Sequence, residues 1–192
     1  MRDRTEQYQH ARTAAVGLAL QLTLALAPSL PVRAEPAGSA TAKESLVVCG
    51  QVDELSAADK PIALARGLQL AEDAVAADDH DAKAHFALFC NLGKQMQVTG
   101  ISFRSWSNFR RLRRELDTTL ALAPNDPDAL AAKGALLLHL PRLLGGDAVE
   151  SERLLRQALA VEPDNGPARR YLAEALEDRG ASDQARALLA SR

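Results

Sequence analysis

The chain has 192 residues, of which 47% are hydrophobic, 4% are aromatic and 25% are charged. A formal charge of -2 at pH 7 provides no general attraction toward nucleic acid or an anionic membrane surface. Few aromatic residues, few β-branched runs and little two-residue alternation argue against a β-sandwich, so the composition indicates one all-helical domain.

The amino-terminal segment has the three parts of a secretory signal peptide. Three arginines lie within the first 12 residues, an apolar run covers 14–27, and the small residues Val32 and Ala34 stand at the cleavage-site positions. The apolar run is shorter than the roughly 20 residues that a membrane span needs. We therefore predict that residues 1–34 are removed as a signal peptide of the bacterial kind. The mature protein is then expected to be periplasmic or secreted, without a stable membrane span. The alternative is a retained membrane anchor.

A short stretch, 35–43, joins this segment to the first expected helix. It is rich in Pro, Gly, Ser and Ala and has no apolar period, which predicts a mobile linker. Apolar residues at helical spacing begin after it, over 44–55 and again over 61–77. The helical domain is therefore expected to cover residues 44–192.

One stretch, Asp78-Asp79-His80-Asp81, resembles a set of metal ligands. It lies between two expected helices, the second of them over 85–96, and Asp81 is suited to capping that helix. The turn-forming glycines of a hard-cation loop are missing, and neither His85 nor His139 has a second histidine four residues away. The sequence therefore predicts no metal and no other cofactor.

The segment 97–109 interrupts the second pair of helices. It carries Trp106, the only tryptophan, and two of the four phenylalanines. A long connection with large apolar groups is either a lid packed onto the helices or a surface that binds a partner. The packed lid is the favoured expectation, because exposed tryptophan is uncommon in monomers.

Four arginines follow within the segment 110–114. Apolar residues recur at helical spacing from Phe109 to Ala123, which places these arginines on the flanks and outer face of a helix. A solvated helix face is the simpler interpretation, and a nucleic-acid partner is not expected of an acidic, exported protein. If the arginines bind a ligand, planar guanidinium groups are suited to a carboxylate, such as that of an acidic peptide.

A second distinctive loop covers 140–147. Pro141 ends one helix, Gly145 and Gly146 permit a tight reversal, and Asp147 caps a helix expected over 148–161. Paired glycines before a helix can also bind an anion. Asp147 would repel that anion, so a structural role is favoured.

From residue 127 to the end, the chain contains two successive helix-turn-helix units. Leu172, Ala173 and Leu176 share one helix face, Gly180 breaks that helix, and Ala185, Leu188 and Leu189 line the helix that follows. The closing turn Pro163-Asp164-Asn165 has an earlier copy, Pro124-Asn125-Asp126, and a degraded one over 76–80.

These small residues and turn prolines resemble the tetratricopeptide repeat family, whose unit is about 34 residues long. The resemblance implies a stack of antiparallel helix hairpins, an α-solenoid of about four units, which binds a protein or peptide in a helical groove and mediates interaction or assembly. The loop over 140–147 also resembles tetratricopeptide-like periplasmic proteins associated with TRAP-type solute transporters. That resemblance implies the alternative, a ligand-binding or transport-accessory protein of the cell envelope.

The expected groove is lined by the first helix of each hairpin. Candidate partner-binding residues there, together with the tryptophan of the long connection, are His85, Phe89, Asn91, Lys133, Leu137 and Trp106. No nucleophile with its base, zinc-ligand pair or pair of carboxylates has a supporting context, so an enzyme is not expected. A short stack leaves its end face exposed, where a second copy could pack to form an oligomer.

The two cysteines, Cys49 and Cys90, lie on the first helices of successive hairpins. Such helices are neighbours in a stacked array, and an exported protein meets oxidising conditions, so we predict a disulfide. Closing a loop of this length contributes about 4 kcal/mol in the chain-entropy description. The alternative is two buried free thiols that pack as small apolar residues.

Overall fold

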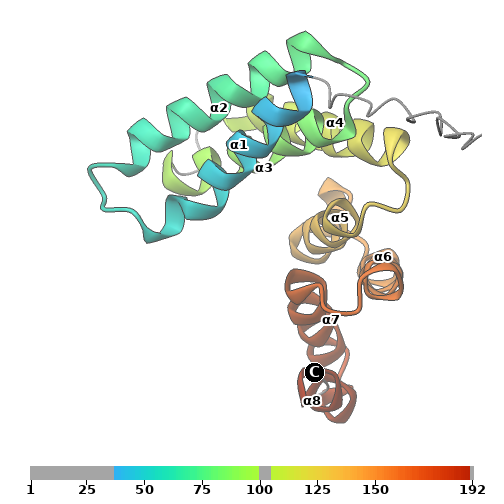
Figure 1. Ribbon diagram of the computed structural model, residues 1–192. Helices are drawn as coiled ribbons and strands as arrows, with labels where there is room; N and C mark the ends of the chain where they lie inside the picture. Colours follow the sequence, from blue (N-terminus) through green and yellow to red (C-terminus); the bar gives the residue numbers. More distant parts are fainter. Residues whose placement is uncertain (1–36, 100–104, 191–192) are drawn as a thin grey trace, which may run out of the picture. The chain divides into compact units, whose positions relative to one another are not determined.

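The computed structural model describes residues 37–99 and 105–190 (Figure 1). Within these ranges the chain forms eight α-helices, two short 3-10 helices and no strand, which confirms the all-helical fold. The elements are α1 (Ala37–Gln51), η1 (Val52–Glu54), α2 (Lys60–Ala77), α3 (Ala82–Thr99), α4 (Ser105–Leu122), α5 (Pro127–His139), η2 (Arg142–Leu144), α6 (Ala148–Val161), α7 (Gly166–Asp178) and α8 (Ser182–Ala190). The predicted signal peptide, 1–34, lies outside the described residues.

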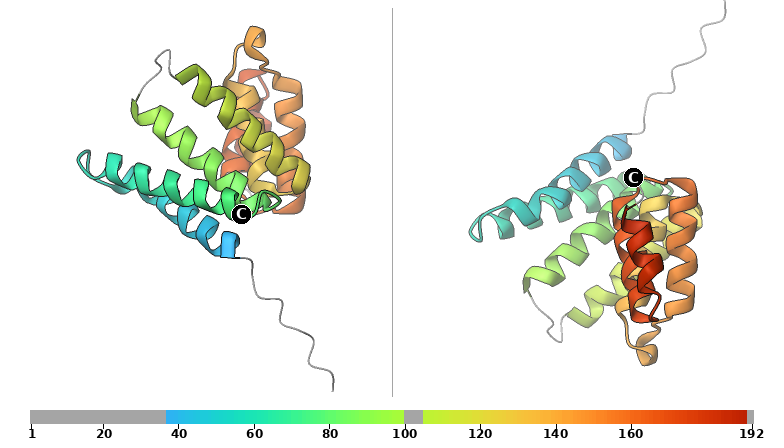
Figure 2. Two further views of the ribbon diagram at one scale, coloured as in Figure 1. Left: turned by 90° about the horizontal axis from the view of Figure 1, so that it is seen from above. Right: turned by 90° about the horizontal axis from the view of Figure 1, so that it is seen from below.

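Consecutive helices pack as antiparallel hairpins, α1 with α2, α3 with α4, α5 with α6, and α7 with α8 (Figures 1 and 2). First helices also pack on one another, α1 on α3 and α5 on α7, and α2 and α6 each contact the helix that follows. Helix α4 contacts α5 much less. The predicted stack is therefore present, but it consists of an amino-terminal block, α1–α4, and a carboxy-terminal block, α5–α8.

Side-chain caps explain where the helices of the carboxy-terminal block begin. The Asp126 carboxylate accepts a hydrogen bond from the Ala129 N–H at 2.8 Å, and the Asn165 amide oxygen accepts one from the Ala168 N–H at 2.9 Å. Each bond satisfies a backbone donor that has no partner inside the first helical turn. Proline also stands in the first turn of α5 and of α7, where a missing N–H costs nothing. These are the closing turns that the sequence predicts.

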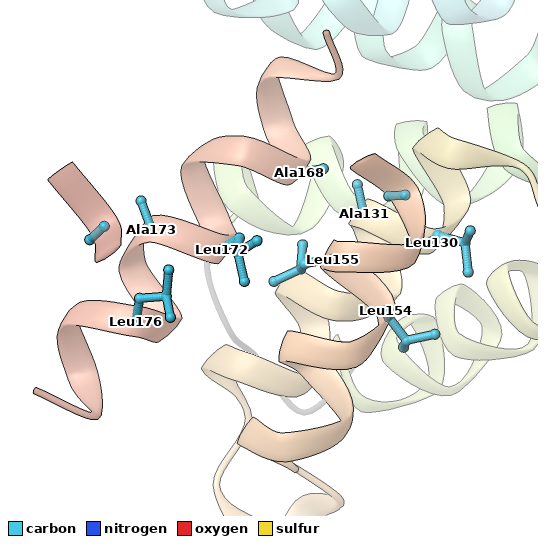
Figure 3. Packing of buried hydrophobic residues seen from close by; sticks show 10 residues of the cluster. Leu130, Ala131, Leu154, Leu155, Ala168, Leu172, Ala173 and Leu176 are labelled. Atoms are coloured by element: carbon cyan, nitrogen blue, oxygen red, sulfur yellow. The ribbon is translucent and has the colours of Figure 1, made fainter. Parts of the chain in front are cut away.

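Leucine and alanine side chains form the core of the carboxy-terminal block (Figure 3). Leu155 of α6 is fully buried and lies between Ala131 of α5 and Leu172 of α7. Gly134 lets α5 approach α6 closely, because a Cβ atom there would be 2.6 Å from Cγ of Leu155. Burial of one leucine contributes about 1.5–3 kcal/mol, so this cluster holds together the four helices that contribute to it, α5 to α8.

Alanine predominates in the core of the amino-terminal block. Its buried residues are Ala42, Ala71, Ala74, Ala84, Ala87, Leu88, Leu92 and Leu112. Short side chains let the helices pack closely, but each one removes little apolar surface from water. A disulfide between Cys49 of α1 and Cys90 of α3 adds a covalent link across 41 residues of sequence. This is the pairing that the sequence predicts.

Helix α1 begins earlier than expected, and the predicted linker is wrong for residues 37–43. Ala42 is fully buried in the core of the amino-terminal block. Gly38 lies against α2, since a Cβ atom at this position would be 3.1 Å from the backbone oxygen of Ala74. Packing against α2 therefore extends the helix over a segment whose composition alone resembles a linker.

The long interruption predicted over 97–109 is also wrong. Helix α3 continues to Thr99 and α4 begins at Ser105, so most of this segment is helical. The later helix expected over 148–161 is confirmed by α6. Among the described residues, no helix combines the length and apolar character needed to cross a membrane.

Candidate functional site

His85 is part of the packing between α3 and α4. The residue is only 8% exposed, with Nδ1 2.7 Å from a carboxylate oxygen of Glu115 and Nε2 2.9 Å from the backbone oxygen of Asp79. Both ring nitrogens therefore have acceptors inside the protein. The expectation that His85 lines an open groove is wrong, because the polar group has a structural reason for its position.

Asn91 is fully buried where α1, α2 and α3 meet. Its amide nitrogen donates hydrogen bonds of 2.9 Å to Oγ of Ser45 and to the backbone oxygen of Ala87. A Cβ atom on Gly67 of α2 would clash with the Asn91 amide oxygen, so the glycine makes room for this side chain. Asn91 is therefore a packing residue, and its predicted contact with a partner is wrong.

Phe89 is partly buried against the core of the amino-terminal block. Its ring stacks on that of Phe86, with 5.7 Å between the ring centroids. The position of Phe89 is thus explained by contacts within the block.

Lys133 and Leu137, by contrast, line a common hollow between α4 and α5. It has a volume of about 90 Å³, and its walls are Arg113, Leu116, Asp117, Lys133, Leu136, Leu137 and Leu140. Nζ of Lys133 is 2.7 Å from a carboxylate oxygen of Asp117. Small-molecule sites commonly exceed about 300 Å³, so this hollow matches a single side chain of a partner better than a free ligand.

Trp106 lies in the first turn of α4 and is 51% exposed, so the packed lid expected from the sequence is wrong. Its ring stacks on Phe109 with 5.7 Å between centroids, and the Arg113 guanidinium lies 6.0 Å from the Phe109 centroid. Nη1 of Arg113 then donates a 3.3 Å hydrogen bond to the backbone oxygen of Leu144. These contacts connect the edge of α4 to the loop between α5 and α6.

That loop presents leucine side chains to solvent. Leu143 is 98% exposed and Leu144 is 41% exposed. Gly145 has a φ of 92°, in the left-handed region that favours glycine, and a Cβ atom on Gly146 would clash with the backbone of Leu140. The predicted reversal is therefore present, and it holds two leucines at the surface.

Asp147 caps α6 as predicted. Its carboxylate accepts hydrogen bonds of 3.0 Å from the N–H groups of Val149 and Glu150. The Glu150 carboxylate in turn accepts a hydrogen bond from Arg153, which lowers the pKa of Glu150. The acidic groups at this helix start are thus engaged in local contacts.

The arginines of α4 and of the loop between α5 and α6 differ in their partners. Arg111 of α4 forms an ion pair of 2.8 Å with Glu72 of α2. Arg110, Arg114 and Arg142 form no ion pair with any side chain in the described part of the chain. We define the α4–loop surface as Trp106, Phe109, Arg110, Arg113, Arg142, Leu143 and Leu144.

Of this surface, Trp106 was selected from the sequence as a candidate partner-binding residue, and the arginines of 110–114 were given a carboxylate only as a conditional ligand. The leucines of the loop were interpreted as part of a structural reversal. The sequence does contain a signal for this surface, the pair Leu143-Leu144 between a helix-ending proline and two glycines. Residues in such a turn lie outside a helix, so they do not belong to the apolar helix face that packs in the core.

The acidic cluster before α3 is accounted for by local hydrogen bonds. Its potential ligand atoms, from Asp78, Asp79 and His80, lie within 4.8 Å of one another. Asp78 accepts a 3.0 Å hydrogen bond from the His80 backbone, and Asp81 accepts one of 2.9 Å from the Lys83 backbone. Asp81 therefore bonds to the first turn of α3, as expected, and the cluster by itself defines no metal site.

The fold and its exposed surface define a helical-hairpin scaffold. A model of the tetratricopeptide repeat family matches residues 142–191, the part of the chain that contains η2, α6, α7 and α8. This similarity indicates a scaffold for protein–protein interaction. No curated protein matches the chain.

Proposed function

We propose that the protein is an exported, non-catalytic scaffold that holds a protein partner in the cell envelope. The similarity of residues 142–191 to the tetratricopeptide repeat is the observation that carries this proposal. Stacked hairpins provide a rigid support on which exposed side chains keep fixed positions. A partner-binding role requires such a support and does not require a catalytic group.

Two features support export. The first is the signal-like pattern over residues 1–34, with its basic end, apolar run and small residues before the expected cleavage point. The second is the disulfide between Cys49 and Cys90, since disulfides persist mainly in oxidising compartments. An oxidising compartment would allow this disulfide to stabilise the amino-terminal block, whose core is mostly alanine.

The transport-accessory alternative rests on the resemblance of the loop over 140–147, and such a carrier would use the segment around Trp106 as a lid over a cavity. This side chain is half-exposed, and the α4–α5 hollow has a volume of about 90 Å³. Neither observation favours a carrier that encloses a metabolite or lipid. We therefore propose the scaffold alone.

The test begins with the full chain, tagged at its carboxy terminus and produced in the host that encodes it. Intact-mass analysis of the protein from the envelope fraction is expected to show a chain that starts at Glu35, with no free thiol. A chain that keeps residues 1–34 and is recovered from the cytosol would contradict export.

Cross-linking of the same cells, followed by affinity purification and mass spectrometry, tests the scaffold function. We expect a specific protein partner whose cross-links map to the helical domain. An unrelated exported helical protein with the same tag is the control. Recovery of a stoichiometric small molecule without a protein partner would contradict the proposal and favour a carrier.

A further inference from the structure

We propose that the α4–loop surface binds an acidic, leucine- or phenylalanine-containing segment of the protein partner. The apolar side chain of that segment packs on Trp106 and Leu143. Its carboxylates bind the arginines of α4 and of the loop. This inference rests on the scaffold function and names the kind of partner that the scaffold holds.

Several apolar side chains of the α4–loop surface are exposed to solvent. Leu143 is almost fully exposed, and Trp106 and Leu144 are each about half-exposed. They belong to one surface, because the Arg113 guanidinium contacts both the Phe109 ring and the Leu144 carbonyl. Apolar side chains gathered in this way are typical of interaction sites, whereas single exposed leucines are common and carry no such meaning.

The α4–loop surface also carries arginines that have no acidic partner within the described part of the chain. Most arginines elsewhere in the described residues lie close to a carboxylate, as in the pairs Arg66–Glu44 and Arg153–Glu150. At the α4–loop surface, Arg110 and Arg142 have no such partner in the part of the chain that the structure describes. A partner that carries carboxylates would supply the missing negative charge.

Arg113 joins the apolar and charged parts. Its contacts with Phe109 and the Leu144 carbonyl hold the guanidinium in place. A guanidinium has five N–H donors, and the hydrogen bond to Leu144 uses only one of its nitrogens. The remaining donors of a group already held in position can bind a carboxylate with a small loss of side-chain entropy.

The α4–α5 hollow adjoins this arginine. Arg113 contributes to its wall together with Lys133 and Leu137. Its volume of about 90 Å³ suits one small side chain of the same segment. A chain lying along the edge of α4 could therefore reach both the loop leucines and the hollow.

A polypeptide explains the surface better than nucleic acid does. The formal charge of the chain is -2, and the Asp117–Lys133 pair lies at the hollow beside Arg113. Nucleic-acid sites depend on extended basic surfaces that neutralise many phosphates. Exposed leucine side chains have no counterpart on a phosphate backbone.

The test uses a fluorescent dodecapeptide of alternating leucine and glutamate and the full chain in its disulfide-bonded form. Fluorescence anisotropy is expected to show binding that weakens at high salt. The same peptide with lysine in place of glutamate, and a single-stranded oligonucleotide of equal length, are expected to bind much more weakly. Absence of binding by the acidic peptide, or tighter binding by the oligonucleotide, overturns the inference.

Two variants locate the site. The double variant R110Q/R142Q and the single variant Leu143→Ser are each expected to weaken peptide binding roughly tenfold. The matched controls on α2 are Arg66→Gln and Ile62→Ser, which change an exposed arginine and an exposed apolar residue in the other block. Circular dichroism verifies that all variants keep their helices. Equal loss in the α2 controls, or unchanged binding in the surface variants, overturns the inference.

The protein recovered by cross-linking separates the two proposals. If R110Q/R142Q and Leu143→Ser both retain that partner in native amounts, the α4–loop surface is not its site, while the scaffold function stands. If the native chain recovers no protein partner, the scaffold function itself fails.

Discussion

The amino-terminal and carboxy-terminal blocks have the same hairpin architecture but are stabilised differently. The carboxy-terminal block has a leucine-rich core with Leu155 at its centre, and it contains the residues that match the tetratricopeptide repeat. The amino-terminal block combines an alanine-rich core with the Cys49–Cys90 disulfide and the buried amide of Asn91. Helix hairpins can thus stack without the usual repeat pattern when covalent and polar links supplement a small apolar core.

The largest expected effect comes from the disulfide. Replacing Cys49 and Cys90 with serine is expected to lower the free energy of unfolding by about 4 kcal/mol, because the unfolded chain regains the freedom of a long loop. Urea unfolding followed by circular dichroism measures this change. Addition of a reductant to the native protein should reproduce it and should leave the double variant unchanged. A variant as stable as the native protein would show that the alanine core suffices alone.

Leu155 tests the other block. Leu155→Ala is expected to cost about 3 kcal/mol of unfolding free energy, since it leaves a cavity between α5, α6 and α7. The matched control is Leu189→Ala, which shortens a leucine that is half-exposed on α8 and should change little. Hydrogen exchange should show the loss of protection in α5–α7. Equal loss of protection in α1–α3 would mean that the two blocks unfold as one unit.

Asn91 tests the polar link of the amino-terminal block. Asn91→Ala removes the hydrogen bonds to Ser45 and Ala87 and is expected to cost about 2 kcal/mol. Gln97→Ala, at an exposed position on the same helix, is the control. Thermal unfolding of both variants measures the difference. A loss as small as that of the control would show that the amide is dispensable to the packing of α1, α2 and α3.

The smallest effects concern exposed ion pairs, one in each block. The hydrogen bond from Lys94 lowers the pKa of Asp53, and that from Arg153 lowers the pKa of Glu150. A carboxyl group with a lower pKa in the folded state adds stability above its unfolded pKa, and this stability is lost as the pH falls through the folded pKa. Because both carboxyl groups are exposed, the contribution is small.

Lys94→Met and Arg153→Met should each return the pKa of the partner carboxyl toward its ordinary value, 3.8 for Asp53 and 4.5 for Glu150. Carboxyl chemical shifts followed by NMR during an acid titration provide the measurement. Each substitution should leave the other carboxyl unaffected, which makes the two variants controls for each other. A shift at both carboxyls would reveal coupling between the blocks.

Several features of the fold follow from short stretches of sequence. The closing turns at Asp126 and Asn165 and the helix capped by Asp147 are encoded locally, because a side chain that accepts a bond from a helix start needs only its neighbours. The expected stacking of first helices and the expected export favoured a pairing of Cys49 and Cys90 over two free thiols, and the structure confirms the disulfide.

The burial of individual side chains depends on contacts between segments that are distant in the sequence. The local sequence around Asn91 is compatible with a position in a groove or in a core. Asn91 is buried because α1 and α2 pack around it. Trp106 was expected to be covered, but α4 places it at an edge. The sequence by itself predicted the all-helical fold, the closing turns and, as one of two alternatives, the pairing of the cysteines. Only the tertiary structure decided which polar groups are buried and which apolar groups remain for a partner, because burial depends on the helices that pack around each residue.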